Sequence, residues 1–328
     1  MDASVLAGFD QIIDVRSPSE FAEDHLPGAI NLPVLDDAER AVIGTEYVQG
    51  SKFKARRQGA VLVARNIAAH LEGALAEQTG GFKPLIYCWR GGQRSHAMAT
   101  ILDQVGWPVT VLDGGYQTWR RAVVAALYDQ PLAHRLVRID GPTGVGKTAM
   151  LGQLAAEGVQ TLDLEGLANH RGSLFGAMPG GQPSQKLFDS RLMTALQGLD
   201  VTAPVVVEAE SSRVGGVNLP KSLWRAMQAA PVIELTASLD DRVARTLRDY
   251  ADFTTDLTAI AAALTSLPRH ISKARRAEWL ELAQAGDMDA FVRALLSEHY
   301  DPAYGRGRAE PVARVEGLEA VQAVLGRI

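Results

Sequence analysis

Eight residues near the middle of the chain form a complete phosphate-binding motif. The run Gly141-Pro-Thr-Gly-Val-Gly-Lys-Thr148 fits G-x-x-x-x-G-K-[ST], with an apolar, strand-like run before it and a helix-forming run after it. The glycines let the backbone turn so that several N–H groups point at one anion, and the N-terminus of the next helix adds partial positive charge. We therefore expect a phosphate-bearing ligand to be bound by Gly141, Thr143, Gly144, Val145, Gly146, Lys147 and Thr148.

The motif alone does not identify the ligand of this loop. Lys147 is expected to reach terminal phosphates, and Thr148 is the candidate ligand of a Mg²⁺ ion. A hydrolytic P-loop protein usually has an aspartate at the end of a second strand, whereas the run PVVVEAE offers Glu208 and Glu210. Three roles are compatible with Glu208: a ligand of Mg²⁺, a general base, or a partner in a buried ion pair. No nucleobase-binding motif accompanies the loop, so ATP is one candidate among phosphate ligands.

The second reactive constellation surrounds Cys88, the one cysteine of the chain. It follows the apolar run PLIY and opens CWRGGQRS, which leads into a helix-forming segment. A thiol at a helix N-terminus, surrounded by backbone N–H groups and an arginine, has a lowered pKa and reacts as a thiolate. A buried structural cysteine is the alternative. The loop predicts a catalytic set made of Cys88, Arg90, Gly91, Gly92 and Arg94.

The spacing of the cysteine and the arginine leaves two chemistries open. Five residues separate Cys88 from Arg94, which fits both a long rhodanese-like loop and a cysteine-dependent phosphatase. Such a loop has room for an anion larger than one transferred sulfur atom. A phosphatase would also need a general acid, for which Asp14 and Asp113 are the candidates.

Alternating strand and helix patterns must position these two loops. Strands are expected at 11–15, 84–88 and 109–115, with helices at 59–78, 91–106 and 116–127. After a break at 129–135 the pattern restarts with strands at 136–140, 161–164, 204–210 and 231–237, and the chain is mostly helical beyond 238. Strands that alternate with helices predict parallel sheets covered by helices. We expect one domain over 1–128, a linker over 129–135 and a second domain over 136–328.

The bulk composition is that of an ordinary globular protein with two domains. The chain has 328 residues, 47% of them hydrophobic and 22% charged. It has no long apolar run of the kind that spans a membrane and no basic, signal-like N-terminus, so we expect a cytoplasmic protein that does not use a membrane. A single cysteine excludes an internal disulfide. The sequence gives no indication of the oligomeric state.

The net charge of −5 argues against a generally basic, nucleic-acid-binding surface. Two local basic runs stand out nevertheless. Each is interpreted either as a solvated helix face or as a contact for an acidic partner. The first run contains Lys52, Lys54, Arg56 and Arg57, and the second contains Arg269, His270, Lys273, Arg275 and Arg276.

Longer stretches resemble a known family. The run DVRSPSEFAEDHLPGAINLP (14–33) resembles the opening signature of rhodanese domains, and VLDGGYQTWR (111–120) follows the cysteine loop. Behind the phosphate-binding loop stand LANHRGSLFG (167–176) and QPSQKLFDS (182–190). Together, over nearly the whole chain, these runs resemble the tRNA 2-selenouridine synthase family. The resemblance implies an α/β fold, with an N-terminal rhodanese-like parallel-sheet domain and a C-terminal P-loop NTPase-like domain that ends in a helical part.

The resemblance also implies an activity. Members of this family are transferases that replace sulfur by selenium on 2-thiouridine at the wobble position of tRNA, with selenophosphate as the selenium donor. They also attach a geranyl group from geranyl diphosphate to the thiouridine sulfur. Cys88 matches the family's catalytic cysteine, which would either carry selenium or hold selenophosphate. The phosphate-binding loop suits the diphosphate of geranyl diphosphate, with or without Mg²⁺.

The resemblance assigns further residues to the two clefts. Asp14 and Arg16 are expected to brace the cysteine loop, and Trp89 either stacks on a base or packs. The remaining cleft candidates are Arg171, Ser173, Gln185, Glu208 and Arg213. The basic runs become tRNA-binding candidates, namely Lys52, Lys54, Arg56, Arg57, Arg269, Lys273, Arg275 and Arg276. Two other interpretations compete: a cysteine-dependent phosphatase fused to an ATPase, and a sulfur or selenium carrier with a P-loop nucleotide switch.

Overall fold

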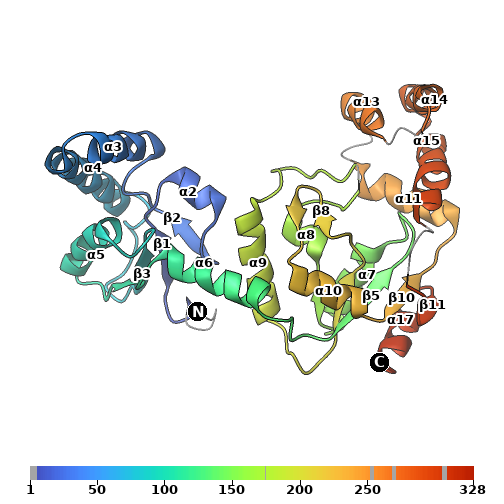
Figure 1. Cartoon of the computed structure of the whole chain (residues 1–328), viewed down its shortest axis with the longest axis horizontal. Coiled ribbons are helices and arrows are strands. Elements are labelled where there is room, and N and C mark those ends of the chain that lie inside the picture. The colour runs from blue at the N-terminus through green and yellow to red at the C-terminus, as the bar shows by residue number, and fades with distance from the viewer. Residues whose placement is uncertain (1–5, 174, 252–254, 268–270, 305–308) are drawn as a thin grey trace. The chain divides into compact units, whose positions relative to one another are not determined.

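The computed structural model describes residues 6–173, 175–251, 255–267, 271–304 and 309–328. Its contacts divide the chain into two compact units. The first unit holds residues 1–130 and 183–198, and the second holds residues 131–182 and 199–328. Each unit is built on a parallel sheet with helices packed around it, so the predicted α/β fold is confirmed (Figure 1).

The first unit contains a four-stranded parallel sheet in the order β2-β1-β3-β4. Its strands are β1 (Gln11–Asp14), β2 (Ala29–Asn31), β3 (Pro84–Tyr87) and β4 (Thr110–Val111). All four positions of β3 are buried, as expected of a central parallel strand. The helices of this unit are α2 (Pro18–Glu23), α3 (Asp37–Gln49), α4 (Lys52–Glu72), α5 (Gln93–Val105), α6 (Tyr116–Val124, extended by a π turn over Ala125–Asp129) and α9 (Gln185–Gln197).

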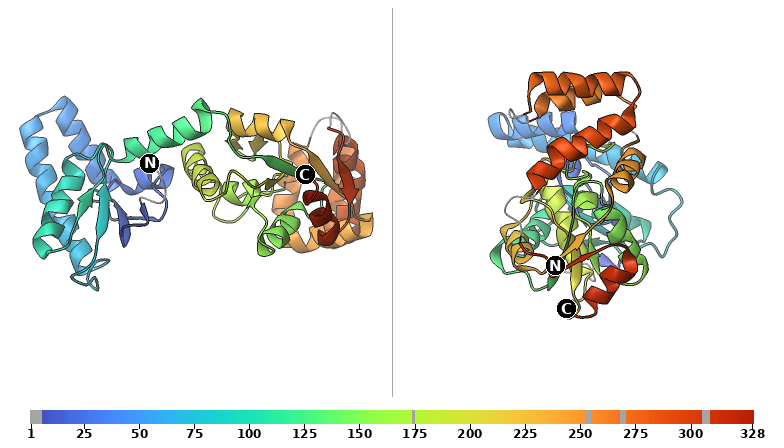
Figure 2. Two further views of the ribbon diagram at one scale, coloured as in Figure 1. Left: turned by 90° about the horizontal axis from the view of Figure 1, so that it is seen from below. Right: turned by 90° about the vertical axis from the view of Figure 1, so that its right-hand side faces the viewer.

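The helices α3 and α4 differ from the sequence prediction. A helix was expected over 59–78, but α4 begins at Lys52, and α3 was not predicted. Their caps explain both starts: the Asp36 side chain accepts from the Glu39 N–H, and Ser51 Oγ accepts from the Lys54 N–H. The two helices form an antiparallel hairpin that is visible in two views (Figures 1 and 2).

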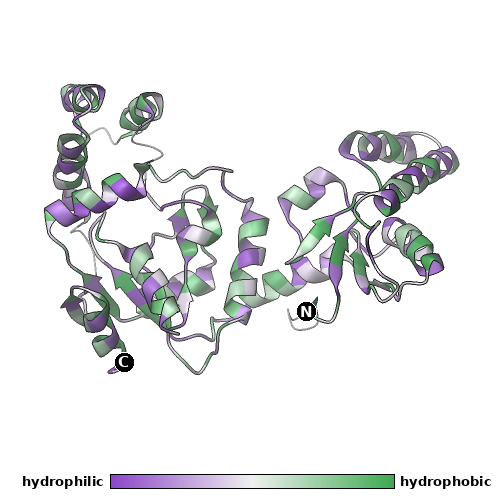
Figure 3. Ribbon diagram, turned by 180° about the vertical axis from the view of Figure 1, so that it is seen from behind, coloured by the Kyte–Doolittle hydropathy of each residue, from purple (hydrophilic) through white to green (hydrophobic). Residues whose placement is uncertain are grey.

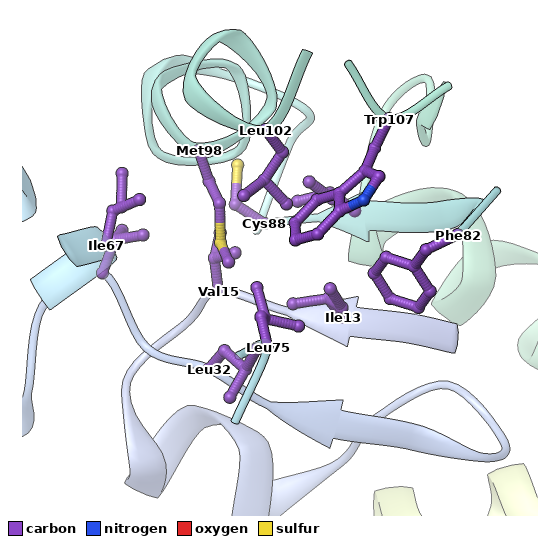
Figure 4. Close-up of a cluster of buried hydrophobic side chains, with 12 residues drawn as sticks. Ile13, Val15, Leu32, Ile67, Leu75, Phe82, Cys88, Met98, Leu102 and Trp107 are labelled. Atoms are coloured by element: carbon purple, nitrogen blue, oxygen red, sulfur yellow. The ribbon is translucent and has the colours of Figure 1, made fainter. Parts of the chain in front are cut away.

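A buried apolar cluster lies behind the cysteine loop. Figure 4 shows Cys88 beside Met98 and Leu102 of α5, above side chains from β1 and the segments around it. Ile13, Val15 and Ile86 of this cluster are fully buried. The loop therefore stands on a close-packed core, which fixes the position of its backbone.

Helix α9 lies in the sequence between elements of the second unit but packs with the first. The Trp119 indole N–H donates to Ser190 Oγ at 3.0 Å, and Arg120 pairs with Asp189 at 2.7 Å. Tyr128 also donates to the Asp189 carboxylate, at 3.0 Å. Trp119 is fully buried, so its removal would leave a cavity worth about 3–5 kcal/mol of stability. Figure 1 shows α9 beside the end of α6.

The second unit contains a five-stranded parallel sheet in the order β11-β10-β5-β7-β6. Its strands are β5 (Leu136–Asp140), β6 (Thr161–Leu162), β7 (Val205–Glu208), β10 (Val232–Leu235) and β11 (Ala313–Val315), and a small antiparallel hairpin joins β8 (Arg213–Val214) to β9 (Val217–Asn218). Figure 3 shows that the strands of both sheets are largely hydrophobic, whereas the helices mix polar and apolar residues.

The helices of the second unit form two groups. One group surrounds the sheet, with a core that includes Ile139, Leu151 and Val206. The other is a C-terminal helical bundle with its own core around Trp279 and Phe291. The helices are α7 (Lys147–Ala156), α8 (Leu164–Ala168), α10 (Lys221–Ala229), α11 (Leu239–Asp249), α13 (Leu257–Ser266), α14 (Lys273–Gln284), α15 (Met288–Leu295, followed by a π turn over Leu296–Tyr300), α16 (Asp301–Tyr304) and α17 (Leu318–Leu325). Among the described helices none has the length and apolar character needed to cross a membrane.

Candidate functional sites: the cysteine loop and the phosphate-binding loop

The cysteine loop is held by the start of α6. The Tyr116 N–H donates to the Cys88 carbonyl at 2.8 Å, and the Gln117 N–H donates to the Trp89 carbonyl at 3.2 Å. These bonds require a close approach at Gly115, which has a φ of 56° and where a Cβ atom would overlap the Cys88 carbonyl oxygen. The run DGG at 113–115 therefore allows α6 to dock against the back of the loop.

The Cys88 sulfur lies among hydrogen-bond donors. The Gly92 N–H donates to Sγ at 3.1 Å, and Ser95 Oγ lies 3.2 Å from Sγ. Burial alone would raise the pKa of the Cys88 thiol, but hydrogen bonds from the Ser95 hydroxyl and from backbone N–H groups outweigh burial and lower that pKa below its ordinary value. Ser95, to which the sequence assigned no role, is thus the nearest side-chain partner of the thiol.

An open pocket of about 520 Å³ lies in front of this sulfur. The predicted residues Cys88, Trp89, Arg90, Gly92 and Arg94 line it, together with Glu20, Arg40 and Gln93. The volume is large enough for a tetrahedral anion together with part of a larger substrate. Trp89 is half-buried, and its ring lies 5.1 Å from that of Tyr116, so it packs at the wall of the pocket.

Arg94 has a carboxylate partner that the motif did not reveal. Its guanidinium pairs with Glu20 at 2.6 Å, and this ion pair lowers the pKa of Glu20 against the effect of burial. Arg40, on α3, also lies close enough to lower the pKa of Glu20 and lines the same pocket. Because α2 and α3 supply Glu20 and Arg40, no local pattern around Cys88 could have pointed to them.

Asp14 and Arg16 lie behind the loop. Both side chains are buried, and Arg16 makes hydrogen bonds of 2.6–3.0 Å to the Asp14 carboxylate. The Arg16 guanidinium also lies 4.1 Å from the ring centroid of Tyr116, whose N–H holds the cysteine loop. This pair therefore braces the loop through α6 and has no exposed surface with which to contact a ligand.

The phosphate-binding loop joins β5 to α7 through three backbone positions that suit glycine. Gly141, Gly144 and Gly146 all have positive φ angles. Lys147 Nζ donates to the Gly141 carbonyl at 3.2 Å, so its side chain folds back over the loop. Val145 is buried in the core of the sheet and anchors the tip of the loop. The predicted strand–loop–helix context is present.

Two arginines on α11 contact the loop from the other side. Arg242 Nε donates to the Thr143 carbonyl at 2.8 Å, and the Arg242 guanidinium pairs with Asp301 at 2.6 Å. The Arg245 guanidinium donates to the Gly144 and Val145 carbonyls. The sequence analysis missed both. Their spacing of three residues on one amphipathic helix, which places them on one face, is the signal that could have indicated them.

Three glutamates crowd beside Thr148. The Thr148 hydroxyl donates to Glu165 at 3.0 Å, and the Glu165 N–H donates to Glu208 at 2.8 Å. Burial first, and the neighbouring Glu165 charge second, raise the pKa of Glu210 to about 8. Glu165 and Glu210 share a hydrogen bond, so the pair retains a proton at neutral pH.

Glu208 is the most deeply buried of the three. Burial and the surrounding carboxylates raise its pKa well above the ordinary value, and its Oε2 atom has no hydrogen-bond partner in the described part of the chain. Of the three roles considered for Glu208, the buried ion pair has no counterpart among the described residues.

The Thr148 hydroxyl and the carboxylates beside it are oxygen ligands that suit a cation which also binds a phosphate ligand. Across the residues that the structure describes, no three carboxylate or imidazole groups form a complete metal cage. Mg²⁺ commonly takes one or two protein ligands and completes its shell with water and phosphate oxygens. Thr148 and Glu165 are the residues that would hold it, beside a cluster of carboxylates that a cation would stabilise.

The other cleft candidates are distributed over several elements. Ser173 Oγ lies 2.9 Å from the Tyr250 hydroxyl of the second unit, and the Arg171 guanidinium lies 4.9 Å from the Tyr250 ring centroid. Arg213 donates to the Gly215 carbonyl within its own hairpin. Gln185 belongs to α9 in the first unit, where its amide donates to Asp189.

The two basic runs differ in character. Lys52, Lys54, Arg56 and Arg57 are all exposed on the first turns of α4. In the second run, Arg275 pairs with Glu278 and Glu298, while the Arg276 guanidinium donates to three backbone carbonyls of the preceding segment. Lys273 is exposed, and Arg269 lies outside the described residues together with His270. The second run is thus largely engaged within the helical bundle.

We predict that Ser95→Ala raises the pKa of the Cys88 thiol, because it removes the largest hydrogen-bonding contribution to the thiolate. In the wild type the thiolate forms at a lower pH than in a free cysteine, and the rate of alkylation should follow that fraction. The measurement is the pH profile of Cys88 alkylation in both proteins, with Ser19→Ala as an exposed serine control. An identical midpoint in wild type and Ser95→Ala would contradict this account of the thiol.

Each of the two loops lies in a region that a family model matches. The family model for the tRNA 2-selenouridine synthase AAA domain matches residues 134–274, and the model for the rhodanese-like domain matches residues 3–122. Among solved structures, a rhodanese-related protein from Thermoplasma volcanium is 18% identical, with a TM-score of 0.24, over 37% of this chain and 84% of that protein.

Relatives that align over nearly their whole length are tRNA 2-selenouridine synthases. The tRNA 2-selenouridine synthase of Pseudomonas syringae pv. syringae is 34% identical over 341 aligned residues, which cover 93% of this chain and 90% of the relative. That of Bordetella petrii is also 34% identical and covers 96% of this chain and 91% of the relative. With this identity over nearly the whole length of both proteins, the chain belongs to the tRNA 2-selenouridine synthase family.

Proposed function

We propose that this protein is a tRNA-modifying transferase that converts wobble 2-thiouridine to 2-selenouridine. The observation that carries the proposal is the presence, in one chain of this family, of a loop that stabilises a thiolate and a complete P-loop. A phosphatase fused to an ATPase would use similar loops, but nearly full-length similarity to tRNA 2-selenouridine synthases favours the transferase.

The P-loop serves the first of two steps. The thiouridine sulfur attacks C1 of geranyl diphosphate, so that a carbon–sulfur bond forms, the carbon–oxygen bond breaks and pyrophosphate leaves. Loop N–H groups and Lys147 would stabilise the charge that develops on the leaving group. Thr148 and Glu165 would hold a Mg²⁺ ion, which would neutralise part of the diphosphate charge.

The second step uses the cysteine loop. S-alkylation makes the sulfur a better leaving group. The selenium of selenophosphate adds at C2, the carbon–sulfur bond at C2 breaks and geranyl thiol departs, after which water cleaves the phosphorus–selenium bond and releases phosphate. The N–H groups around Cys88, with Arg90 and Arg94 lining the same pocket, suit the selenophosphate anion. Cys88 holds this anion without forming a covalent bond, because a sulfur–selenium bond between a thiolate and selenide-level selenium would require a two-electron oxidant. A selenium adduct on the intact protein that is absent from Cys88→Ser would contradict this role.

We expect Lys147→Ala to slow geranylation strongly but not selenation of RNA that is already geranylated, because only the first step needs the diphosphate site. The loss of a charge-assisted contact to the leaving group should slow geranyl transfer by roughly 100-fold or more. Product nucleosides are measured by mass spectrometry for each substrate. Lys221→Ala removes an exposed lysine at the start of α10 in the same unit and serves as the control. An equal loss of geranylation and selenation would contradict the assignment of the P-loop to geranylation alone.

The hairpin of α3 and α4 is the tRNA-binding surface that we favour. The exposed basic side chains of the first run accompany two exposed aromatic residues, Tyr47 and Phe53, the latter 75% exposed. Lys52 Nζ lies 5.8 Å from the Tyr47 ring centroid. Cations interleaved with exposed aromatic rings match the phosphates and unstacked bases of a tRNA loop.

Charge reversal on this hairpin should weaken tRNA binding. The double variant Lys52→Glu/Arg57→Glu removes two candidate phosphate contacts, so the slope of log Kd against log salt should fall by about one per contact. Binding is measured across a salt titration, with Arg225→Glu, an exposed arginine outside both runs, as the control. Unchanged affinity and slope would indicate that these side chains only form a solvated helix face and do not contact tRNA.

A further inference from the structure

The cysteine pocket continues into a second hollow on the surface of the first unit. This hollow has a volume of about 590 Å³ and lies over α2 and α3. Glu20 of α2 and Arg40 of α3 line both hollows, so the two meet at these side chains. We call the second hollow the α2–α3 groove; its other polar walls come from Ser17, Ser19, Asp37, Thr45 and Gln49.

Arg40 is the cation at the junction of the two hollows. Its side chain is exposed, and among the described residues no group accepts a hydrogen bond from its guanidinium or forms an ion pair with it. Its Nη1 atom lies over Gly44, one turn further along α3, where a Cβ atom would approach it to 2.8 Å. The missing side chain at Gly44 therefore leaves room for the Arg40 guanidinium in the groove.

The two carboxylates of the groove already have partners. Glu20 accepts from the Arg94 guanidinium at 2.6 Å. Asp37 accepts from the Ser19 hydroxyl at 2.5 Å and from the Ser19 N–H at 3.1 Å. These bonds occupy both carboxylates, whereas the Arg40 guanidinium keeps its donors for a ligand.

The far end of the groove leads to the hairpin of α3 and α4. Val48 and Gln49, at the C-terminal end of α3, line that end. The neighbouring residue Tyr47 is exposed, and its ring centroid lies 5.8 Å from Lys52 Nζ and 6.0 Å from the Arg56 guanidinium carbon. A largely polar surface therefore runs from the Cys88 thiol past Arg40 to an exposed aromatic ring that two cations accompany.

A single strand of RNA matches this surface. A base that reaches the thiol leaves the neighbouring nucleotides outside the cysteine pocket, so a flanking nucleotide has to cross its rim. A free cation at the rim suits the backbone phosphate, and an exposed aromatic ring further on suits an unstacked base. A small free anion would fill only the space in front of the sulfur and would not extend along α3.

We propose that the α2–α3 groove binds the RNA strand that flanks the modified nucleotide, and that Arg40 contacts the phosphate beside the base at Cys88. The assignment rests on the proposed function, which supplies the RNA, and it adds the path of the strand. In this arrangement Arg94 stays with the anion at the cysteine loop, and Arg40 serves the RNA.

The first test couples Arg40 to one phosphate. Dissociation constants are measured on the full chain for a stem-loop RNA that carries 2-thiouridine at the wobble position, unmodified or with a neutral methylphosphonate at either phosphate beside that nucleotide. Arg40→Ala should weaken binding of the unmodified RNA about tenfold and lower the slope of log Kd against log salt by about 0.7. One of the methylphosphonates should weaken binding to the wild type by a similar factor, but binding to Arg40→Ala no further.

Arg191→Ala is the matched control for this measurement. Arg191 is an exposed arginine of α9 in the same unit and lines neither hollow. It should bind all three RNAs as the wild type does. Losses from Arg40→Ala and from each methylphosphonate that simply add would overturn the contact, although the wild type still binds the RNA. Failure of the wild type to bind the RNA would overturn the proposed function as well.

A second variant displaces the Arg40 guanidinium without removing its charge. Gly44→Ala places a Cβ atom against Nη1 and should weaken RNA binding by roughly threefold or more, because a charge-assisted bond depends on geometry. It should not lower the unfolding temperature, since alanine favours a helix interior over glycine. The control is Gly59→Ala on α4, whose Cβ atom would meet only Ile43, at 3.5 Å. Unchanged affinity in Gly44→Ala, or an equal loss in Gly59→Ala, would overturn the assignment.

Protection of Cys88 distinguishes RNA from a small anion as the partner of Arg40. Stem-loop RNA and inorganic phosphate should each slow alkylation of Cys88, because both cover the thiol. Arg40→Ala should raise the RNA concentration that gives half-protection about tenfold, but change that of inorganic phosphate by less than about twofold. An equal shift for both ligands would assign Arg40 to the anion site of the cysteine loop, and the proposal would be wrong.

Discussion

Backbone N–H groups directed at a negative charge are the interaction on which both sites depend. In each unit a parallel strand ends close to the start of the next helix. The loop between them presents backbone N–H groups whatever side chains it carries. At Cys88 the Gly92 N–H already points at the sulfur. At the P-loop, Gly141, Gly144 and Gly146 have positive φ angles, which suit a loop whose N–H groups face one anion. The rest of each unit keeps these loops from relaxing.

The supports of the two loops are different. The cysteine loop is pinned by the N-terminus of α6 and by the buried Asp14–Arg16 pair behind it. The P-loop is held by arginines of α11 that donate to its carbonyls, and it faces glutamates whose pKa values are raised by burial. The cysteine loop thus favours a thiolate or a compact anion. The P-loop lies beside carboxyl groups whose protonation depends on nearby charge, and a phosphate ligand together with a cation would complete that site.

Local pattern predicted the central strands, both loops and the α/β architecture, because these depend on neighbours in the sequence. It did not predict β8, β9 or β11, the last of which lies in a stretch that was expected to be mostly helical. It did not predict Glu20 and Arg40 in the cysteine pocket, since α2 and α3 bring them there from distant positions. It also placed Gln185 with the P-loop residues, whereas α9 packs against α6 through Ser190 and Asp189. The basic run at 273–276 was equally ambiguous, because only tertiary contacts reveal that Arg276 binds backbone carbonyls.

The central claim is that Cys88 performs selenium transfer while a separate loop activates the thiouridine. The most direct test is mass spectrometry of nucleosides from 2-thiouridine-containing tRNA that has been incubated with geranyl diphosphate, selenophosphate and either wild type or Cys88→Ala. The account predicts selenouridine from wild type, and geranylated thiouridine without selenouridine from Cys88→Ala. Selenouridine from both proteins, or no modified nucleoside from wild type, would contradict it.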